Sequence, residues 1–273
     1  MPRPTAVEQQ LRARARELLE KREVAGVLGF RAGTLPGTCV PFLATEPGDA
    51  DRLVLNRDCA ANLAAWLPRL RHRGRIAVVA RGPDSRSIVN LVKENQVERD
   101  RLHIIGVADP DDTQPVRNPV VFDEFLGERA PDSPPDDYAD IREFEALPPA
   151  ERWQALLDEL SRCIRCYACR QVCPNCYCPT CFVDASRPAW VGRTPDPSDN
   201  VLFHMVRAIH MAGRCVECGA CAKACPIGIP LMIINRKVSL IVRDRFGSVP
   251  GTDPDAPLPL TAFDSEDREE FIR

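Results

Sequence analysis

The chain has 273 residues, more than one typical domain, and 44% of them are hydrophobic, as in an ordinary globular protein. A formal net charge of −3 and only 6% aromatic residues argue against a nucleic-acid-binding or base-stacking surface. The sequence contains no apolar run of roughly 18 residues, and its N-terminal segment lacks the apolar core of a secretory signal. We therefore expect no membrane span and a cytoplasmic location, where thirteen cysteines would be reduced and available to metal.

The first seventy residues predict a helix, two strands and a second helix. Residues 5–23 are amphipathic with a helical period, and 24–30 and 39–45 are short apolar segments joined by a Gly/Pro turn. The next segment, CAANLAAWLPRL, predicts a helix capped by Asp58 and ended or kinked by Pro68.

Two compact apolar segments, 75–80 and 102–108, read as buried strands. The helical segment 88–96 lies between them, so strand, helix and strand form a βαβ unit. We therefore predict a small α/β domain with a parallel sheet over residues 1–108.

The composition changes in residues 109–149, which hold eight prolines and twelve acidic residues against three arginines. This predicts an acidic, proline-rich linker, in which the segment 120–127 could dock as a short strand. We assign residues 150–246 to a second domain, with helices before, between and after the cysteine-rich segments, and 247–273 to a C-terminal tail.

Eight of the thirteen cysteines form two copies of one spacing, C-x2-C-x2-C-x3-C-P. This spacing is typical of two-cluster 4Fe–4S ferredoxins, in which the fourth cysteine of each run ligates the other cluster. Zinc and disulfides are alternatives for a single copy, but the repetition favours iron–sulfur clusters. The first copy comprises Cys163, Cys166, Cys169 and Cys173, followed by Pro174; the second comprises Cys215, Cys218, Cys221 and Cys225, followed by Pro226.

The crossover predicts two ligand sets within an α+β, two-cluster ferredoxin-like domain. Because 41 residues separate the runs, one cluster built from each run alone is the alternative. The crossed sets are Cys163, Cys166 and Cys169 with Cys225, and Cys215, Cys218 and Cys221 with Cys173.

Three further cysteines, Cys176, Cys178 and Cys181, follow the first run within six residues of one another. They could belong to a third metal site, with Cys59 or Cys39 of the first domain as fourth ligand. At the start of its predicted helix, Cys59 would be favoured as a thiolate by the helix dipole. The alternative is that these cysteines only fill space in a core.

The turn ARGPDSRS follows a predicted strand and opens a helix. There Ser85, Arg86 and Ser87, with free helix N–H groups, could bind an anion such as a flavin phosphate. Ordinary helix capping by these residue types is the alternative.

Two stretches resemble known redox subunits. RIAVVARGPDSRSIVNLVKENQVERDRLHIIGV resembles the beta subunits of deazaflavin-dependent hydrogenases and formate dehydrogenases. DCAANLAAWL and FHMVRAIHMAGRCVECGACAKACPIGIPL look like the dicluster 4Fe–4S subunits that accompany heterodisulfide-reductase-like complexes. The resemblance implies a subunit that links a flavin or deazaflavin partner to a catalytic subunit.

We therefore expect an electron-transfer iron–sulfur subunit of a cytoplasmic multi-subunit oxidoreductase. It would carry two 4Fe–4S clusters, or three if the extra cysteines build another. Its partners would be a flavoprotein, a catalytic subunit or both, because no nucleophile–base constellation stands out in this chain. One alternative is a subunit that itself carries a flavin such as FAD and oxidises a reduced nicotinamide or deazaflavin. A zinc-bearing scaffold or nucleic-acid binder is another.

Overall fold

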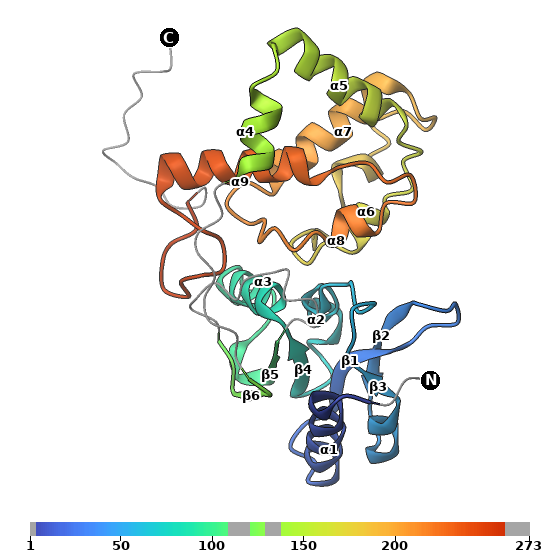
Figure 1. Ribbon diagram of the computed structural model, residues 1–273, viewed down its shortest axis with the longest axis vertical. Helices are drawn as coiled ribbons and strands as arrows, with labels where there is room; N and C mark the ends of the chain where they lie inside the picture. Colours follow the sequence, from blue (N-terminus) through green and yellow to red (C-terminus); the bar gives the residue numbers. More distant parts are fainter. Residues whose placement is uncertain (1–3, 109–120, 129–137, 260–273) are drawn as a thin grey trace.

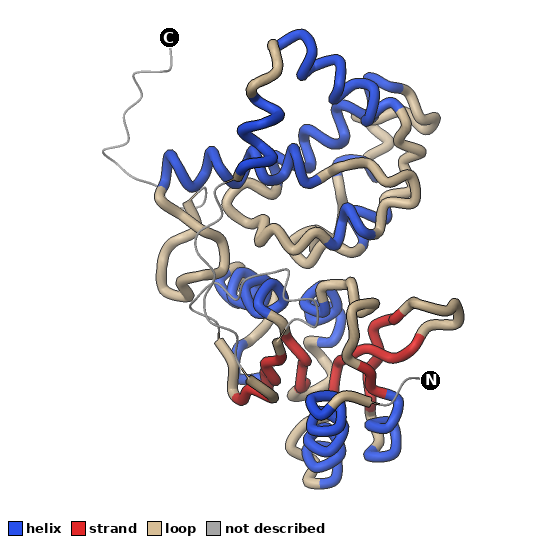
Figure 2. Tube along the Cα trace, viewed as in Figure 1, coloured by secondary structure: helices blue, strands red, loops and turns tan. Residues whose placement is uncertain are grey.

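The structure is a computed structural model that describes residues 4–108, 121–128 and 138–259. Two parts lie one on the other: an α/β part from the first half of the chain and a helical part that carries both cysteine runs (Figure 1). Within the described residues, all strands belong to the first part (Figure 2). None of the helices found there combines the length and apolar character needed to span a bilayer.

The α/β part contains the elements expected from the apolar patterning. Helix α1 begins after Thr5, whose hydroxyl accepts the Glu8 amide at 3.2 Å, and it buries Leu11 and Leu18. Its elements are α1 (Ala6–Glu20), β1 (Gly26–Ala32), β2 (Cys39–Ala44), η1 (Pro47–Arg52), β3 (Leu53–Val54), η2 (Leu63–Trp66), α2 (Leu67–Leu70), β4 (Ile76–Ala80), α3 (Gly82–Lys93), η3 (Arg99–Arg101), β5 (Leu102–Val107) and β6 (Glu124–Leu126).

The α/β class is confirmed, but the sheet is mixed rather than parallel. Its strand order is β2-β1-β4-β5-β6, with β3 paired to β1. Strand β1 is antiparallel to β2 and β3, whereas β1, β4, β5 and β6 are mutually parallel neighbours. The short Gly/Pro turn after β1 permits only an antiparallel return, while the α3 crossover makes β4 and β5 parallel. The strand expected within 120–127 is confirmed as β6, whose Glu124 pairs with Ile105 of β5.

The helix predicted after Asp58 was wrong in its extent. Residues 59–62 are not helical; a 3-10 turn begins at Leu63, and Pro68 lies in the first turn of α2 rather than ending a helix. Proline is tolerated there because the first helical N–H groups have no intrahelical partner. Cys59 is therefore not at a helix N-terminus.

The helical part packs around a small core that includes cysteines of both runs. Phe203, Leu160, Ile229 and Leu231 are buried with Cys163, Cys169 and Cys221. The expected strands of an α+β ferredoxin-like domain are not seen in residues 138–259. The elements are α4 (Ala139–Glu145), α5 (Pro149–Ser161), α6 (Ala168–Gln171), η4 (Phe182–Asp184), α7 (Pro197–His210), α8 (Ala220–Lys223) and α9 (Met232–Phe246).

Helix α3 lies on the side of the sheet that faces the helical part (Figure 1). Its C-cap residue Glu94 forms an ion pair with Arg214 at 2.5 Å, and Asn90 donates to the Arg214 carbonyl at 2.8 Å. The Tyr177 hydroxyl bonds to both Glu94 and the Arg214 guanidinium. Because Arg214 precedes Cys215 and Tyr177 follows Cys176, this polar latch holds both cysteine-rich segments against α3.

Candidate metal-binding site

The two cysteine runs repeat in backbone shape as well as in spacing. In each, the residues just before and just after the second cysteine adopt positive φ: Arg165 and Tyr167 (49° and 58°), and Glu217 and Gly219 (58° and 69°). Each loop then enters a short helix, α6 or α8, and these two helices pack on each other. A non-glycine residue in this region costs about 1–3 kcal/mol and persists where its surroundings impose the shape. The first three cysteines of each run are thus held on a tight loop.

The fourth cysteine of each run lies beside the opposite run. Burial raises the pKa of Cys163, and the nearby Cys166 and Cys225 thiols raise it further. Burial also raises the pKa of Cys218 to about 12, and the Cys173 thiol is the next cause. Such electrostatic effects require proximity, so the structure brings Cys225 to the first run and Cys173 to the second.

Arg207 of α7 lies between the two runs. Only 5% of the residue is exposed; Nη2 donates to the Cys169 carbonyl at 3.0 Å, and Nε has no partner among the described residues. Burial opposes its charge, but the surrounding thiols, Cys173 and Cys221 first among them, hold the pKa of Arg207 above its ordinary value. No carboxylate in the described part of the chain pairs with this buried guanidinium.

The described cysteines do not converge as ligands of a single ion would. No three His, Cys, Asp or Glu side chains in residues 4–108, 121–128 and 138–259 are grouped closely enough to hold one metal ion. A zinc ion needs its four ligands at bonding distance from one point. The thiolates of a cubane instead bind different corners of the cluster and do not meet at one point.

The three extra cysteines line one cavity of about 270 Å³, between the segment after Pro174 and helix α7. An arginine lies beside each thiol: Arg207 by Cys176, Arg214 by Cys178 and Arg170 by Cys181. His210 of α7 also lines the cavity.

Cys59 does not line that cavity; it is packed in the core of the α/β part. Its residue exposure is 1%, and its Sγ lies 3.8 Å from the Val54 carbonyl and from Asn56 Oδ1. Burial raises the pKa of Cys59 to about 12, opposite to the thiolate-favouring effect expected from a helix dipole. Its nearest cysteine is Cys39, which also hydrogen-bonds Asn56, at 3.4 Å.

Ser85, Arg86 and Ser87 are buried in the first turns of α3, and Arg86 reaches the second cysteine run. Arg86 donates to the Val216 carbonyl at 2.7 Å, next to Cys215 in the chain. Ser87 donates to the Pro83 carbonyl and accepts from Asn62, both at 2.9 Å. The turn thus joins the two parts of the molecule.

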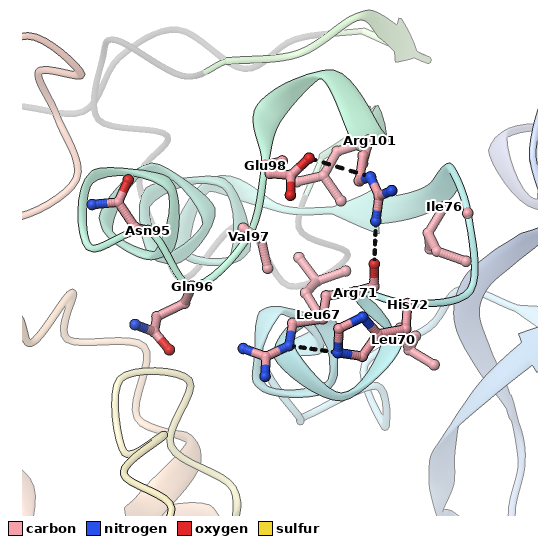
Figure 3. Close-up of a pocket in the computed structure, with 12 residues that line it drawn as sticks. Leu67, Leu70, Arg71, His72, Ile76, Asn95, Gln96, Val97, Glu98 and Arg101 are labelled. Carbon is pink, nitrogen blue, oxygen red and sulfur yellow. Dashed lines mark hydrogen bonds and ion pairs between the residues drawn. The ribbon is translucent and has the colours of Figure 1, made fainter.

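A separate cavity of about 250 Å³ lies at the other end of the sheet, beside the start of β4 and β5 (Figure 3). There Arg101 pairs with Glu98 and donates to the Arg71 carbonyl at 2.7 Å. Ligands of open α/β sheets bind at the carboxyl ends of the strands, and this cavity is at their amino ends, so we assign it no role.

Arg207 and Asn62 belong to the site but were not predicted from the sequence. Arg207 could have been found, because it falls on the buried helical stripe with Asn200, Phe203 and His204, where a charged residue is unexpected. Asn62 belongs to the α/β part of the molecule, and its hydrogen bond to the Cys218 thiol opposes the larger effect of burial, which raises the pKa of Cys218. No local pattern indicates that contact.

Comparisons with known proteins show partial similarity to two curated beta subunits. The chain is 35% identical over 113 residues to the F420-dependent formate dehydrogenase subunit beta of Methanocaldococcus jannaschii, covering 41% of this chain and 28% of that protein. It is 38% identical over 125 residues to the F420-dependent formate dehydrogenase 1 subunit beta of Methanococcus maripaludis, covering 46% and 31%. The chain thus spans less than a third of each relative.

No family model matches the chain. Among solved structures, a chain of the F420-reducing NiFe hydrogenase complex of Methanosarcina barkeri, from a xenon-derivatization study, aligns over 37% of this chain and 36% of its own length. The sequence identity is 14% and the TM-score is 0.28, which is too low to infer a shared fold or function.

Proposed function

We propose that this chain is an electron-transfer subunit of a multi-subunit oxidoreductase and binds two 4Fe–4S clusters in residues 150–246. The crossed arrangement assigns Cys163, Cys166, Cys169 and Cys225 to one cluster and Cys215, Cys218, Cys221 and Cys173 to the other. A bound 4Fe–4S cluster supplies one-electron chemistry without an acid–base group from the protein.

The proximity of Cys225 to the first run and of Cys173 to the second is the observation that supports the proposal. A zinc knuckle or a structural thiol cluster has no need to pair Cys225 with the first run and Cys173 with the second. Two cubanes back to back need this exchange in ferredoxin-type folds. The repeated left-handed positions around Cys166 and Cys218 give the two runs the same tight loop shape, as expected if each run holds one cluster.

Buried Arg207 gives an independent test of whether the residues fit such groups. A guanidinium that meets one carbonyl and the Cys176 and Cys221 thiols, with no carboxylate partner in the described part of the chain, is costly to bury without a negative charge. The thiols around it supply that charge only as thiolates, the form in which cysteine binds iron. Two thiolate-ligated clusters would satisfy Arg207, so the surroundings fit anionic cofactors.

Similarity to the formate dehydrogenase beta subunits supports partner subunits and an oxidoreductase context. We further propose that the catalytic chemistry lies on a partner subunit and that the complex is cytoplasmic, where the thirteen cysteines would stay reduced. The alternative is FAD held by Ser85, Arg86 and Ser87; there Arg86 already donates to the Val216 carbonyl, whereas Ser85 Oγ is buried without a hydrogen-bond partner among the described residues. We favour a flavin on a partner subunit, because Ser85, Arg86 and Ser87 are all buried.

Two single variants test the ligand sets. In anaerobically purified protein, Cys173→Ser should alter the paramagnetic resonance signal of the cluster held by Cys215, Cys218 and Cys221. Cys225→Ser should alter the other signal, and Cys39→Ser, a thiol of the α/β part, should alter neither. If each variant perturbed the cluster of its own run, the crossed assignment would be wrong.

A further inference from the structure

A cavity of about 270 Å³ lies between residues 175–182 and helix α7, outside the two ligand sets assigned above. Its lining gathers Cys176, Cys178, Cys181 and His210. We propose that it binds a third 4Fe–4S cluster, with these four residues as ligands. The inference rests on the proposed function, because it requires a chain that is loaded with clusters.

His210 is the fourth ligand that the cavity offers. Its ring has no hydrogen-bond partner within the described residues and stands edge-to-face against Phe182, the neighbour of Cys181, with ring centroids 5.8 Å apart. Imidazole replaces thiolate on iron in Rieske-type centres, so a mixed Cys and His ligand set is chemically established.

The other groups near the cavity are already engaged. Asp184 pairs with Arg170 at 3.0 Å, and Glu94 pairs with Arg214 at 2.5 Å. The Met211 thioether contacts Cys173 and Cys176, at 3.7 and 4.0 Å. Cys59, the ligand expected from the sequence, lies instead with Cys39 in the α/β core.

The charges around the cavity suit an anionic group. One arginine lies beside each of the three thiols, namely Arg207, Arg214 and Arg170. Arg170 and Arg214 each form an ion pair with a carboxylate. Arg207 pairs with no carboxylate among the described residues. Thiolates bound to a cluster would supply the negative charge that the Arg207 guanidinium lacks.

The cavity position would connect the third cluster to the rest of the molecule. Cys176 lies against Cys173, which we assign to the cluster of the second run. The next residue, Tyr177, hydrogen-bonds Glu94 at the end of α3. The third centre would therefore lie beside one ferredoxin-type cluster and close to the surface of α3. Cys178 and His210 are exposed, so this centre would be the one nearest to solvent on that side.

The test is iron and acid-labile sulfide per chain in the full-length protein, purified anaerobically and reconstituted with iron and sulfide. Wild type should hold about twelve iron atoms, and the double variant Cys178→Ser/Cys181→Ser about eight. Cys39→Ser is the matched control and should keep about twelve. The eight remaining irons report that the double variant has folded.

Two changes at His210 test the fourth ligand. His210→Ala should lose iron toward about eight, or lose the resonance signal that the double variant lacks. His210→Cys should keep about twelve iron atoms and lower the reduction potential of that centre, because thiolate in place of imidazole favours the oxidised state.

Eight iron atoms per chain in wild type, unchanged in the double variant, would overturn the third cluster while leaving the proposed function intact. An unchanged signal and iron content in His210→Ala would overturn this ligand set, and iron near zero in wild type would overturn the proposed function itself.

Discussion

Replacing Arg207 by glutamine should lower the reduction potentials of the clusters, because it removes a buried positive charge from between the two runs. Only 5% of Arg207 is exposed, and its charge is surrounded by Cys169, Cys173, Cys176 and Cys221. For unit charges roughly 6 Å apart in an effective dielectric of about 20, Coulomb's law gives about 3 kcal/mol. At about 59 mV per tenfold for one electron, this corresponds to a fall of roughly 130 mV.

A redox titration followed by paramagnetic resonance measures this shift. Arg207→Lys keeps the charge and should recover most of the potential. Arg162→Gln removes a half-exposed arginine next to Cys163, and solvent screening should hold its effect to about 20 mV or less. Equal potentials for wild type and Arg207→Gln, with iron content unchanged, would refute the view that Arg207 neutralises the clusters.

Two further predictions concern stability. Glu94→Gln should weaken the ion pair with Arg214 and lower the free energy of unfolding by about 1–3 kcal/mol, as measured by anaerobic urea unfolding. Glu159→Gln, which breaks an exposed pair with Arg162, is the control. An equal or smaller effect of Glu94→Gln would contradict the latch. Burial lowers the pKa of His204 to about 4, so the folded state binds fewer protons than the unfolded state below pH 6.5. Wild type should lose about 3 kcal/mol relative to His204→Gln as the pH falls from 7 to 4, and parallel pH profiles of the two proteins would contradict this.

The sequence was sufficient to predict those elements whose residues interact with near neighbours in the chain. The predicted strands 75–80 and 102–108 are mostly apolar, and they form the fully buried neighbours β4 and β5. The two cysteine runs have the same spacing, and they adopt the same loop followed by a short helix. This similarity was predictable because a loop shape depends mainly on residues close together in the chain. The mixed pairing of β1 was missed, since the βαβ pattern concerned only the strands that follow it.

Contacts between distant segments explain what the sequence did not reveal. The turn at Ser85–Ser87 has the composition of an anion site, but Arg86 instead bonds the Val216 carbonyl, 130 positions away. Cys59 was expected beside the extra cysteines, yet its neighbours come from β2 and from Val54 and Asn56. No local pattern points to His210, because its place beside Phe182 and the three extra cysteines depends on the packing of residues 175–182 against α7.

Metal content tests the central claim most directly. The anaerobically purified full-length chain, analysed for iron, zinc and acid-labile sulfide, should contain at least eight iron atoms with matching sulfide, as two 4Fe–4S clusters require. Zinc at one or more per chain, with iron and sulfide near zero, would contradict the account.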